Sequence, residues 1–333
     1  MRAKQVVVIG ASAGGIEALC ELVSGLPADF PAPICIVLHT SPEAPGVLDA
    51  ILSRVGPLPA VNVHGRQRMQ PGHIYVAPPD YHLVVEPGLV RGTKGPRENR
   101  FRPAIDPLFR SAAQVYGPGV IGVILTGNLD DGTAGLWAVK QLGGIAVVQN
   151  PADAMFPSMA QSALRHVSVD HSAPLSDLAP LLVQLTGEPV PEAPAEPALS
   201  PLDVEVKIAM EQNPIDAGLL AVSEPSSFAC PECHGVLLQI NEGGRIRFRC
   251  QTGHGYALDS LLAAITEGIE EALWNAIPAL EEGQMLMSAT GEHLRRHTSP
   301  DAEALLSRAD EAKAQSDALR KLVMDREPIE VKP

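Results

Sequence analysis

Hydrophobic and polar positions alternate in blocks along the first 187 residues of the chain. Short apolar runs at 6–9 and 120–126 end at glycine turns, and amphipathic segments follow them. Runs of this kind predict buried parallel strands, and the 3.6-residue spacing after them predicts helices. Further strands are expected at 33–38, near Val61, and at 74–77, 83–85 and 145–149, with helices at 47–54 and 107–116. The alternation predicts a doubly wound α/β domain, with a mainly parallel sheet between two helical layers (three-layer α/β/α).

The turn after the first strand places Ser12 among small residues, in the sequence GASAGG at 10–15. Small residues let the backbone bend sharply and present the hydroxyl at the carboxyl end of the strand. Such a turn suits either a phosphate cradle of free N–H groups or a nucleophile elbow beside an oxyanion site. A dinucleotide fingerprint would need glycine where Ser12 stands and an acidic residue after the next strand. That strand ends instead in His39.

Asp130 and Asp131 follow the most hydrophobic strand of the domain, in a turn between Gly127 and Gly132. The carboxyl ends of neighbouring parallel strands face one crevice, so one aspartate can meet His39 if its strand lies beside the first two. A serine nucleophile needs a base, and the base needs a carboxylate that fixes its tautomer. The sequence therefore predicts a Ser-His-Asp site, with the other aspartate capping a helix.

The charge of the chain is unevenly distributed. The net charge is −14; residues 1–187 hold 13 basic and 14 acidic side chains, whereas residues 188–333 hold 12 and 25. This excess of acid disfavours nucleic acid as the main partner. No apolar run approaches the roughly 20 residues that cross a bilayer, and no signal peptide is expected before the first strand. The five cysteines argue against a disulfide scaffold, so we expect a cytoplasmic protein without membrane insertion.

Six segments between residues 6 and 185 carry a family resemblance. They read VVVIGASAGGIEAL, IVLHTSP, PGHIYVAPPDYHL, ENRFRPAIDPLF, GVILTGNLDDGTAGL and FPSMAQSAL. In this order they resemble the catalytic domain of the chemotaxis methylesterase CheB. The resemblance implies hydrolysis of γ-glutamyl methyl esters on chemoreceptor helices, with release of methanol, and often deamidation of receptor glutamines. It implies Ser12 as nucleophile, His39 as general base and Asp131 as its carboxylate partner, with no cofactor for catalysis.

Two further groups of residues gain a role from this resemblance. The backbone N–H groups of Ala13 and Asn128 are the expected oxyanion donors, each worth roughly 3 kcal/mol of the barrier. Residues 91–102 are expected to form a basic loop. Because the resemblance implies glutamate-rich receptor helices, Arg100 and Arg102 are expected to bind substrate carboxylates, while Arg91 and Lys94 are expected to be solvated.

Three features depart from the chemotaxis enzymes. The chain starts at the catalytic strand, so we expect no receiver domain and no control by aspartyl phosphorylation within it. The turn reads TGNLDDG where the family usually has TGMGNDG or a close variant, and Leu129 in place of glycine could redirect the nearby backbone donor. A carboxyl-terminal half that those enzymes lack follows.

That half divides into three predicted parts. Residues 188–225 are predicted as a Pro/Glu-rich linker and connecting segment, because 187–201 hold five prolines and three glutamates. Residues 226–257 hold CxxC, sixteen residues and CxxxH around a predicted hairpin turn at 241–244. The expected metal ligands are Cys230, Cys233, Cys250 and His254. This spacing predicts one structural zinc ion in a zinc-ribbon-like module, the alternative being two chance knuckles without metal.

Residues 258–327 are predicted as a helical hairpin, which either packs only on itself or mediates self-association or partner docking. We therefore predict a protein-glutamate methylesterase domain at 1–187, joined to a small zinc-ribbon and helical-hairpin module. One alternative is an inactive signalling adaptor that binds receptor or kinase without turnover. Another is a nucleotide-binding protein that uses the turn at 10–15.

Overall fold

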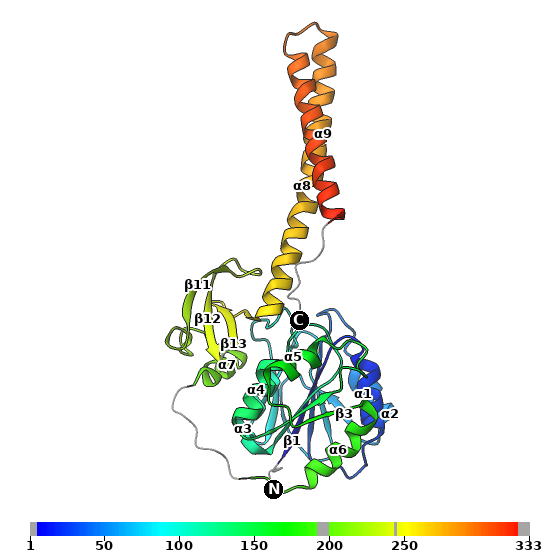
Figure 1. Ribbon diagram of the computed structural model, residues 1–333, viewed down its shortest axis with the longest axis vertical. Helices are drawn as coiled ribbons and strands as arrows, with labels where there is room; N and C mark the ends of the chain where they lie inside the picture. Colours follow the sequence, from blue (N-terminus) through cyan, green and yellow to red (C-terminus); the bar gives the residue numbers. More distant parts are fainter. Residues whose placement is uncertain (1–4, 192–199, 243–244, 326–333) are drawn as a thin grey trace. The chain divides into compact units, whose positions relative to one another are not determined.

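The first unit of the molecule is built on a parallel β-sheet. The computed structural model describes residues 5–191, 200–242 and 245–325, and its contacts divide the chain into Met1–Ser260 and Leu261–Pro333. The seven-stranded sheet has the order β10-β9-β8-β1-β2-β5-β3 (Figure 1). Its strands are β1 (Val6–Ala11), β2 (Ile34–Leu38), β3 (Ala60–Asn62), β5 (Ile74–Val76), β8 (Val120–Ile124), β9 (Ile145–Gln149) and β10 (His171–Ala173).

Alternate side chains of the central strands enter two separate cores. Val6 and Val8 of β1 pack in the core that includes α3 (Ile105–Tyr116), α4 (Thr133–Gln141) and α5 (Ser158–His166). Val7 and Ile9 face the opposite core, with α1 (Gly15–Ser24), α2 (Leu48–Val55) and α6 (Leu175–Gly187) (Figure 1). Successive residues of a strand point to opposite faces, so a continuous apolar run is what a sheet covered on both sides requires. The predicted three-layer α/β/α fold is confirmed.

A small antiparallel sheet of order β4-β7-β6 adds to this unit. Its strands are β4 (Arg66–Arg68), β6 (His82–Glu86) and β7 (Leu89–Thr93), and a short 3₁₀ turn, η1 (Gly117–Gly119), precedes β8. The prediction of a loop from residue 91 is therefore wrong for its first three residues. They pair with β6, and Gly92 also lets this strand pass close to another segment, because a Cβ there would lie 2.2 Å from the Val63 carbonyl oxygen.

The segment 188–225 contains a helix that its composition did not predict. In α7 (Pro201–Ala209), the Ser200 hydroxyl accepts from the Asp203 N–H, and the Asp203 carboxylate accepts from the Ser200 N–H. This capping box satisfies donors at the start of the helix, and Val204 and Ile208 of α7 are buried. A 3₁₀ turn, η2 (Leu219–Ala221), follows. The proline-rich residues 192–199 of the predicted linker lie outside the described residues.

A four-stranded antiparallel sheet, here called the ribbon, completes the first unit. It consists of β11 (Glu224–Ala229), β12 (Val236–Glu242), β13 (Arg245–Cys250) and β14 (Gly255–Ala257), in that order. Residues 243–244 of the predicted hairpin turn lie outside the described residues. Leu238 and Ile240 of β12 share a small core with Val204 and Ile208, so α7 packs on the ribbon.

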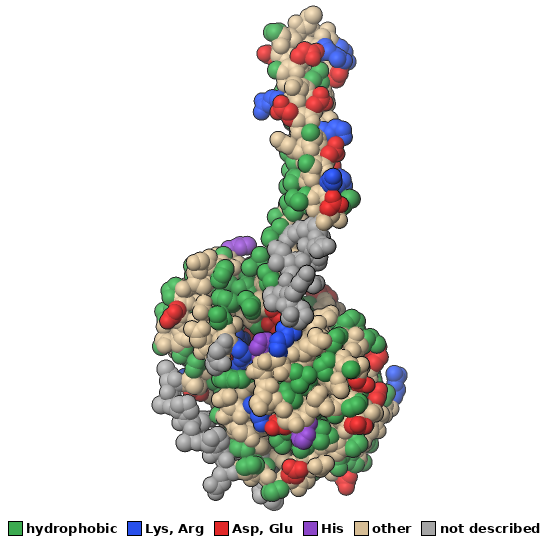
Figure 2. All heavy atoms as spheres, viewed as in Figure 1, with side chains coloured by type: hydrophobic (Ala, Val, Ile, Leu, Met, Phe, Trp, Pro, Cys, Tyr) green, Lys and Arg blue, Asp and Glu red, His purple; other side chains and the backbone are tan. Residues whose placement is uncertain are grey.

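The second unit consists of two long helices. They are α8 (Leu258–Arg296), whose first three residues belong to the first unit, and α9 (Ala302–Met324). Glu281 of α8 accepts hydrogen bonds from Ser316 at 3.1 Å and Arg320 at 2.6 Å of α9. Figure 2 shows acidic and basic side chains interleaved along this pair. In the part of the chain that the structure describes, every helix is too short or too polar to span a membrane.

Candidate active site

Ser12 lies directly after β1, in a turn that is locked to the end of β8. The Ser12 N–H donates to the Thr126 carbonyl at 3.0 Å, and the Thr126 hydroxyl donates to the Ala13 carbonyl at 3.0 Å. Gly127 allows this approach, because a Cβ there would lie 2.8 Å from the Ser12 Cβ. The Ser12 hydroxyl is thus held at the carboxyl edge of the sheet.

The structure brings His39 and Asp131 to the same edge. β1 lies between β2, which His39 follows, and β8, which precedes the turn containing Asp131. The His39 Nδ1 lies 3.1 Å from the Ser12 Oγ, and the His39 Nε2 lies 2.7 Å from the Asp131 Oδ2. The side chains of His39 and Asp131 are only 3% and 2% exposed. The three residues form one continuous chain of hydrogen bonds.

The charge of Asp131 fixes the tautomer of His39. Burial opposes ionisation of Asp131. The hydrogen bond and charge of His39, with hydrogen bonds from the Ile105 N–H and the Asn99 amide, outweigh burial and lower the pKa of Asp131 to about 2. An ionised carboxylate only accepts hydrogen bonds. The Nε2 of His39 therefore carries a proton toward Asp131, and the Nδ1 lone pair is left to accept the Ser12 proton.

Asp131 is held by donors besides His39. Its carboxylate accepts from the Ile105 N–H at 2.6 Å and the Asp106 N–H at 3.3 Å, both in the first turn of α3. The Gly132 N–H at 3.0 Å and the Asn99 side-chain amide at 2.7 Å also donate to it. A helix amino terminus supplies free N–H groups and a favourable dipole for an anion. The carboxylate is thereby oriented as well as charged.

Asp130, the neighbouring aspartate, lies against the start of another helix. It accepts from the Ser260 hydroxyl at 2.6 Å and the Asp259 N–H at 3.2 Å, in the first turn of α8. Burial raises the pKa of Asp130 to about 7; the Ser260 hydrogen bond opposes this rise, and the charge of Asp259 adds to it. The capping interpretation thus fits Asp130, although the helix that it caps is α8, more than 100 residues further along the chain.

The raised pKa of Asp130 predicts a pH-dependent stability. In the unfolded chain this carboxyl ionises near its ordinary pKa of about 3.8, whereas in the folded protein it keeps its proton up to about pH 7. The unfolded state therefore loses its proton first, and the free energy of unfolding falls as the pH rises from 4 to 7. Relative to Asp130→Asn, wild type is expected to lose up to about 4 kcal/mol over this range.

Urea unfolding of wild type, Asp130→Asn and the exposed control Asp29→Asn at several pH values measures this effect. The difference in the free energy of unfolding between wild type and Asp29→Asn is expected to be the same at every pH, because Asp29 is exposed. If the free energies of unfolding of wild type and Asp130→Asn changed with pH in parallel, the raised pKa of Asp130 would be contradicted.

The predicted oxyanion donors Ala13 and Asn128 directly follow Ser12 and Gly127, two residues that lie close together. Within the described residues, the N–H groups of Ala13 and Asn128 donate to no other protein group, whereas the Gly127 N–H donates to the Phe156 carbonyl at 2.8 Å. Leu129 has a φ of 64°, in the left-handed region that glycine favours. The TGNLDDG turn therefore keeps a glycine-like backbone at a cost of roughly 1–2 kcal/mol.

Of the two predicted substrate-binding arginines, Arg102 is held by groups outside the hydrogen-bonded chain. The guanidinium of Arg102 donates to the Asp80 carboxylate at 2.9 and 2.6 Å and to the Gly95 carbonyl at 3.0 Å. Its charge is therefore already compensated. Arg100 is half-buried and has a φ of 75°.

Arg91 and Lys94, which were expected to be solvated, both form ion pairs. Arg91 lies 2.7 Å from Glu211, and Lys94 lies 3.1 Å from Asp80.

Three residues of the site were missed at the sequence level. Phe101 stacks on the His39 ring, with 3.9 Å between centroids and 6° between planes. Asn99 donates to Asp131, and it also donates to Asp106, whose pKa burial and the charge of Asp131 raise to about 6. Phe101, Asn99 and Asp106 all belong to the ENRFRPAID segment, in which the sequence analysis assigned roles only to the arginines.

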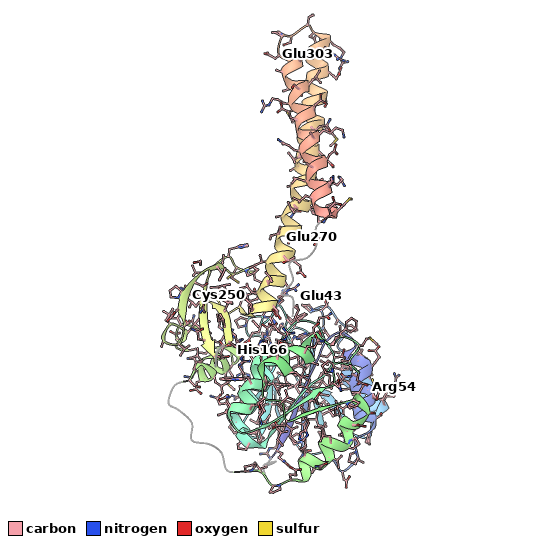
Figure 3. All side chains as sticks on the ribbon, in the orientation of Figure 1. Glu43, Arg54, His166, Cys250, Glu270 and Glu303 are labelled. Carbon is pink, nitrogen blue, oxygen red and sulfur yellow. The ribbon has the colours of Figure 1, made fainter. Side chains whose placement is uncertain are left out.

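The four predicted metal ligands cluster in the ribbon, where Figure 3 labels Cys250. The ligand atoms of Cys230, Cys233, Cys250 and His254 all lie within 4.8 Å of one another. The Nδ1 of His254 is 3.6 Å from the sulfurs of Cys230 and Cys250, and the Cys233 and Cys250 sulfurs are 3.6 Å apart. Tetrahedral ligands at about 2.0–2.3 Å from an ion lie roughly 3.5–3.8 Å from each other. The cluster can therefore hold a metal ion.

Comparison with known proteins places the first half of the chain in one family. The model of the CheB methylesterase family matches residues 7–182. A putative protein-glutamate methylesterase/protein-glutamine glutaminase of Leptospira interrogans is 40% identical over 182 residues, which are 54% of this chain and 94% of that protein. Protein-glutamate methylesterase/protein-glutamine glutaminase 2 of Anaeromyxobacter dehalogenans is 37% identical over 55% of this chain. The match spans only 53% of that relative's own length.

A solved structure agrees with these matches. The crystal structure of the Thermotoga maritima CheB methylesterase catalytic domain aligns with a TM-score of 0.52 and 32% identity, over 54% of this chain and 98% of that one. The family match covers more than half of the chain, including residues 12, 39 and 131. The chain therefore belongs to the CheB methylesterase family.

Proposed function

We propose that this protein is a protein-glutamate methylesterase, which hydrolyses γ-glutamyl methyl esters on chemoreceptor-type helices in the cytoplasm. The hydrogen-bonded chain of Ser12, His39 and Asp131, in a member of this family, is the observation that carries the proposal. The names of the relatives support the same activity and add deamidation of protein glutamine as a second reaction. The five free cysteines are consistent with a reducing compartment.

The first step of the proposed mechanism forms an acyl-enzyme. The Ser12 Oγ attacks the ester carbonyl carbon while the His39 Nδ1 takes the hydroxyl proton. Asp131 stabilises the imidazolium that results, because it remains ionised. The N–H groups of Ala13 and Asn128 donate to the oxyanion of the tetrahedral intermediate. His39 then gives its proton to the departing methoxy oxygen, and methanol leaves.

The second step restores the enzyme. A water molecule loses a proton to the His39 Nδ1 and attacks the acyl carbon, and the Ser12 Oγ leaves as it regains the proton. The products are a glutamate side chain and free Ser12. With glutamine as substrate, the same two steps release ammonia in place of methanol.

Methanol release from a methylated receptor fragment tests the proposed function. The full chain is expected to release one methanol for each ester lost, in many turnovers per enzyme. An adaptor would bind the fragment and release none. A nucleotide-binding protein would be protected from proteolysis or heat by a nucleotide, and His39→Ala would leave this protection unchanged.

Arg100 is proposed to attract the acidic receptor helix. If it does, Arg100→Ala is expected to raise KM for a methylated receptor fragment about 3- to 10-fold, because one charge–charge contact that water still reaches is worth roughly 1 kcal/mol. Its kcat on an uncharged methyl ester is expected to stay near that of wild type. Arg68→Ala, at an exposed position of β4, serves as the control. Equal KM values for wild type and Arg100→Ala would remove this role.

We also propose that the cluster of Cys230, Cys233, Cys250 and His254 holds a structural zinc ion. Three thiolates and one imidazole are typical zinc ligands, and four protein ligands leave no position for substrate. When bound, the ion would join the β11–β12 connection to the β13–β14 connection at one end of the ribbon, and would take no part in hydrolysis.

Removal of the metal is expected to expose three thiols and loosen the ribbon. The purified chain is expected to contain about one zinc ion, and chelation should make three additional cysteines reactive toward a thiol reagent. Cys250→Ser should abolish zinc binding, whereas Cys20→Ser should not. Equal thiol reactivity with and without chelator would count against the site.

A further inference from the structure

The loop at 97–101 joins the ribbon to the candidate active site by its backbone. The Asn99 N–H donates to the Gly255 carbonyl at 2.8 Å, and the Gly255 N–H donates to the Arg97 carbonyl at 3.1 Å. Glu98 pairs with Gly255 in a parallel bridge. The loop that precedes α3 therefore lies alongside β14 of the ribbon and pairs with it through backbone hydrogen bonds.

The Asn99 side chain connects the same strand to Asp131. Its amide nitrogen donates to Asp131 at 2.7 Å and to Asp106 at 3.0 Å, and its amide oxygen accepts from the Ala257 N–H at 2.7 Å. Asn99 is fully buried. Only one orientation of the amide satisfies these partners, because the nitrogen must face the two carboxylates and the oxygen must face the N–H. The position of Ala257 therefore sets the position of the donor to Asp131.

The residues beside Asn99 in the loop contact both the ribbon and the candidate active site. Glu98 pairs with Arg247 and Arg249 of β13, at 3.4 and 2.8 Å. Phe101 stacks on His39. A displacement of the ribbon would thus act on the imidazole and on its carboxylate through one short loop.

Asp130 provides a second connection. It is adjacent to Asp131, and it holds the Ser260 hydroxyl and the Asp259 N–H directly after the ribbon. Asp130 is therefore contacted directly by the segment 255–260. Asp131 is contacted by Asn99, which this segment orients. A site built only from residues 5–187 would lack these contacts.

From these contacts we propose that Asn99 is a positioning residue for Asp131, and that the ribbon strand β14 sets the activity of Ser12 by holding the Asn99 amide in place. This inference rests on the proposed Ser12 mechanism, and it assigns a role to the carboxyl-terminal module. The ribbon supplies no reacting group; it orients one. Misplacement of a catalytic group by about 1 Å can cost about 100-fold in rate.

Two variants of the full chain test the inference from opposite sides. Asn99→Ala removes the amide, whereas Ala257→Pro leaves the amide in place and removes the N–H that holds it, while also fixing φ at position 257. Each is expected to lower kcat about 10- to 100-fold with KM within threefold of wild type. In Asn99→Ala, the acid limb of the pH–kcat profile should also move to higher pH, because a less neutralised Asp131 favours the imidazolium. Ser226→Ala, whose hydroxyl donates to Leu237 inside the ribbon, should match wild type.

The rate at which a fluorophosphonate labels Ser12 tests the role of Asn99 separately from the methylesterase proposal, because labelling needs no receptor substrate. Slower labelling in both variants supports the inference even if wild type releases no methanol. If wild type releases methanol and either folded variant keeps kcat and the labelling rate within twofold, the inference is overturned while the methylesterase proposal stands. In a Trp274→Phe background, fluorescence of Trp137 reports whether the ribbon of each variant is folded in place, because the Trp137 ring centre lies 4.6 Å from the Arg245 guanidinium of β13.

Discussion

Ser12→Ala is expected to lower kcat for methyl ester hydrolysis by at least about 10⁴-fold, with little change in KM. The hydroxyl is the only protein group in the proposed mechanism that forms a covalent bond to substrate, so no acyl-enzyme can form without it. Loss of the nucleophile in a serine hydrolase of this kind typically costs about 10⁶-fold, and the residual rate comes from the oxyanion donors and substrate binding. The fold should be unaffected, because the Ser12 backbone N–H, which binds Thr126, remains.

Methanol release from a labelled receptor fragment measures this effect, and pulldown of the same fragment measures binding. Ser24→Ala, at the exposed end of α1, is the matched control and should retain full activity. Methanol release by Ser12→Ala at more than a hundredth of the wild-type rate would show that another group attacks the ester. Binding by wild type without any methanol would instead favour the adaptor.

The arrangement of Ser12, His39 and Asp131 could be predicted because it depends on a rule that applies to each strand and the turn directly after it. Each residue follows an apolar run, and the carboxyl ends of neighbouring parallel strands meet at one edge. The choice of Asp131 over Asp130 needed the family resemblance. Periodicity alone could not distinguish the two aspartates, since both precede the same helix.

The role of Asn99 could not be predicted in this way. Its partners Asp106 and Asp131 lie within 35 positions, but Ala257 is 158 residues away and belongs to a module that the family match does not reach. Asp130 likewise finds its partner 130 residues further on. Contacts between a family domain and an appended module leave no periodic pattern in either segment. The same holds for α7, whose start lies at the end of a stretch whose prolines and glutamates indicated only a linker.

Glu205→Gln is expected to destabilise the first unit by about 3–5 kcal/mol, the usual cost of removing one partner from a buried ion pair. Glu205, on α7, is fully buried and binds three arginines: Arg110 of α3, Arg247 at 2.8 Å and Arg249 at 2.5 Å, both of β13. Burial opposes its ionisation, but the three guanidinium charges hold its pKa well below the ordinary value. The amide removes one negative charge and leaves these cations with too few partners.

A less buried ion pair between the same segments provides the control for this variant. Glu211, just after α7, pairs with Arg91 of β7, and their side chains are 40% and 28% exposed. Glu211→Gln should cost less than about 1 kcal/mol, since water screens such a pair. Urea unfolding followed by Trp137 fluorescence, in a Trp274→Phe background that removes the other tryptophan, compares the two variants.

The difference between the two variants decides what the buried charges do. If Glu205→Gln costs several kcal/mol and Glu211→Gln almost nothing, the buried cluster is what keeps β13, and with it β14, against the loop that orients Asp131. If both variants cost less than 1 kcal/mol, desolvation offsets the attraction in the cluster. The ribbon would then be retained by its apolar contacts with α7, such as those of Val204 and Ile208 with Leu238, and the same unfolding assay on Ile208→Ala would show a loss of about 2–5 kcal/mol instead.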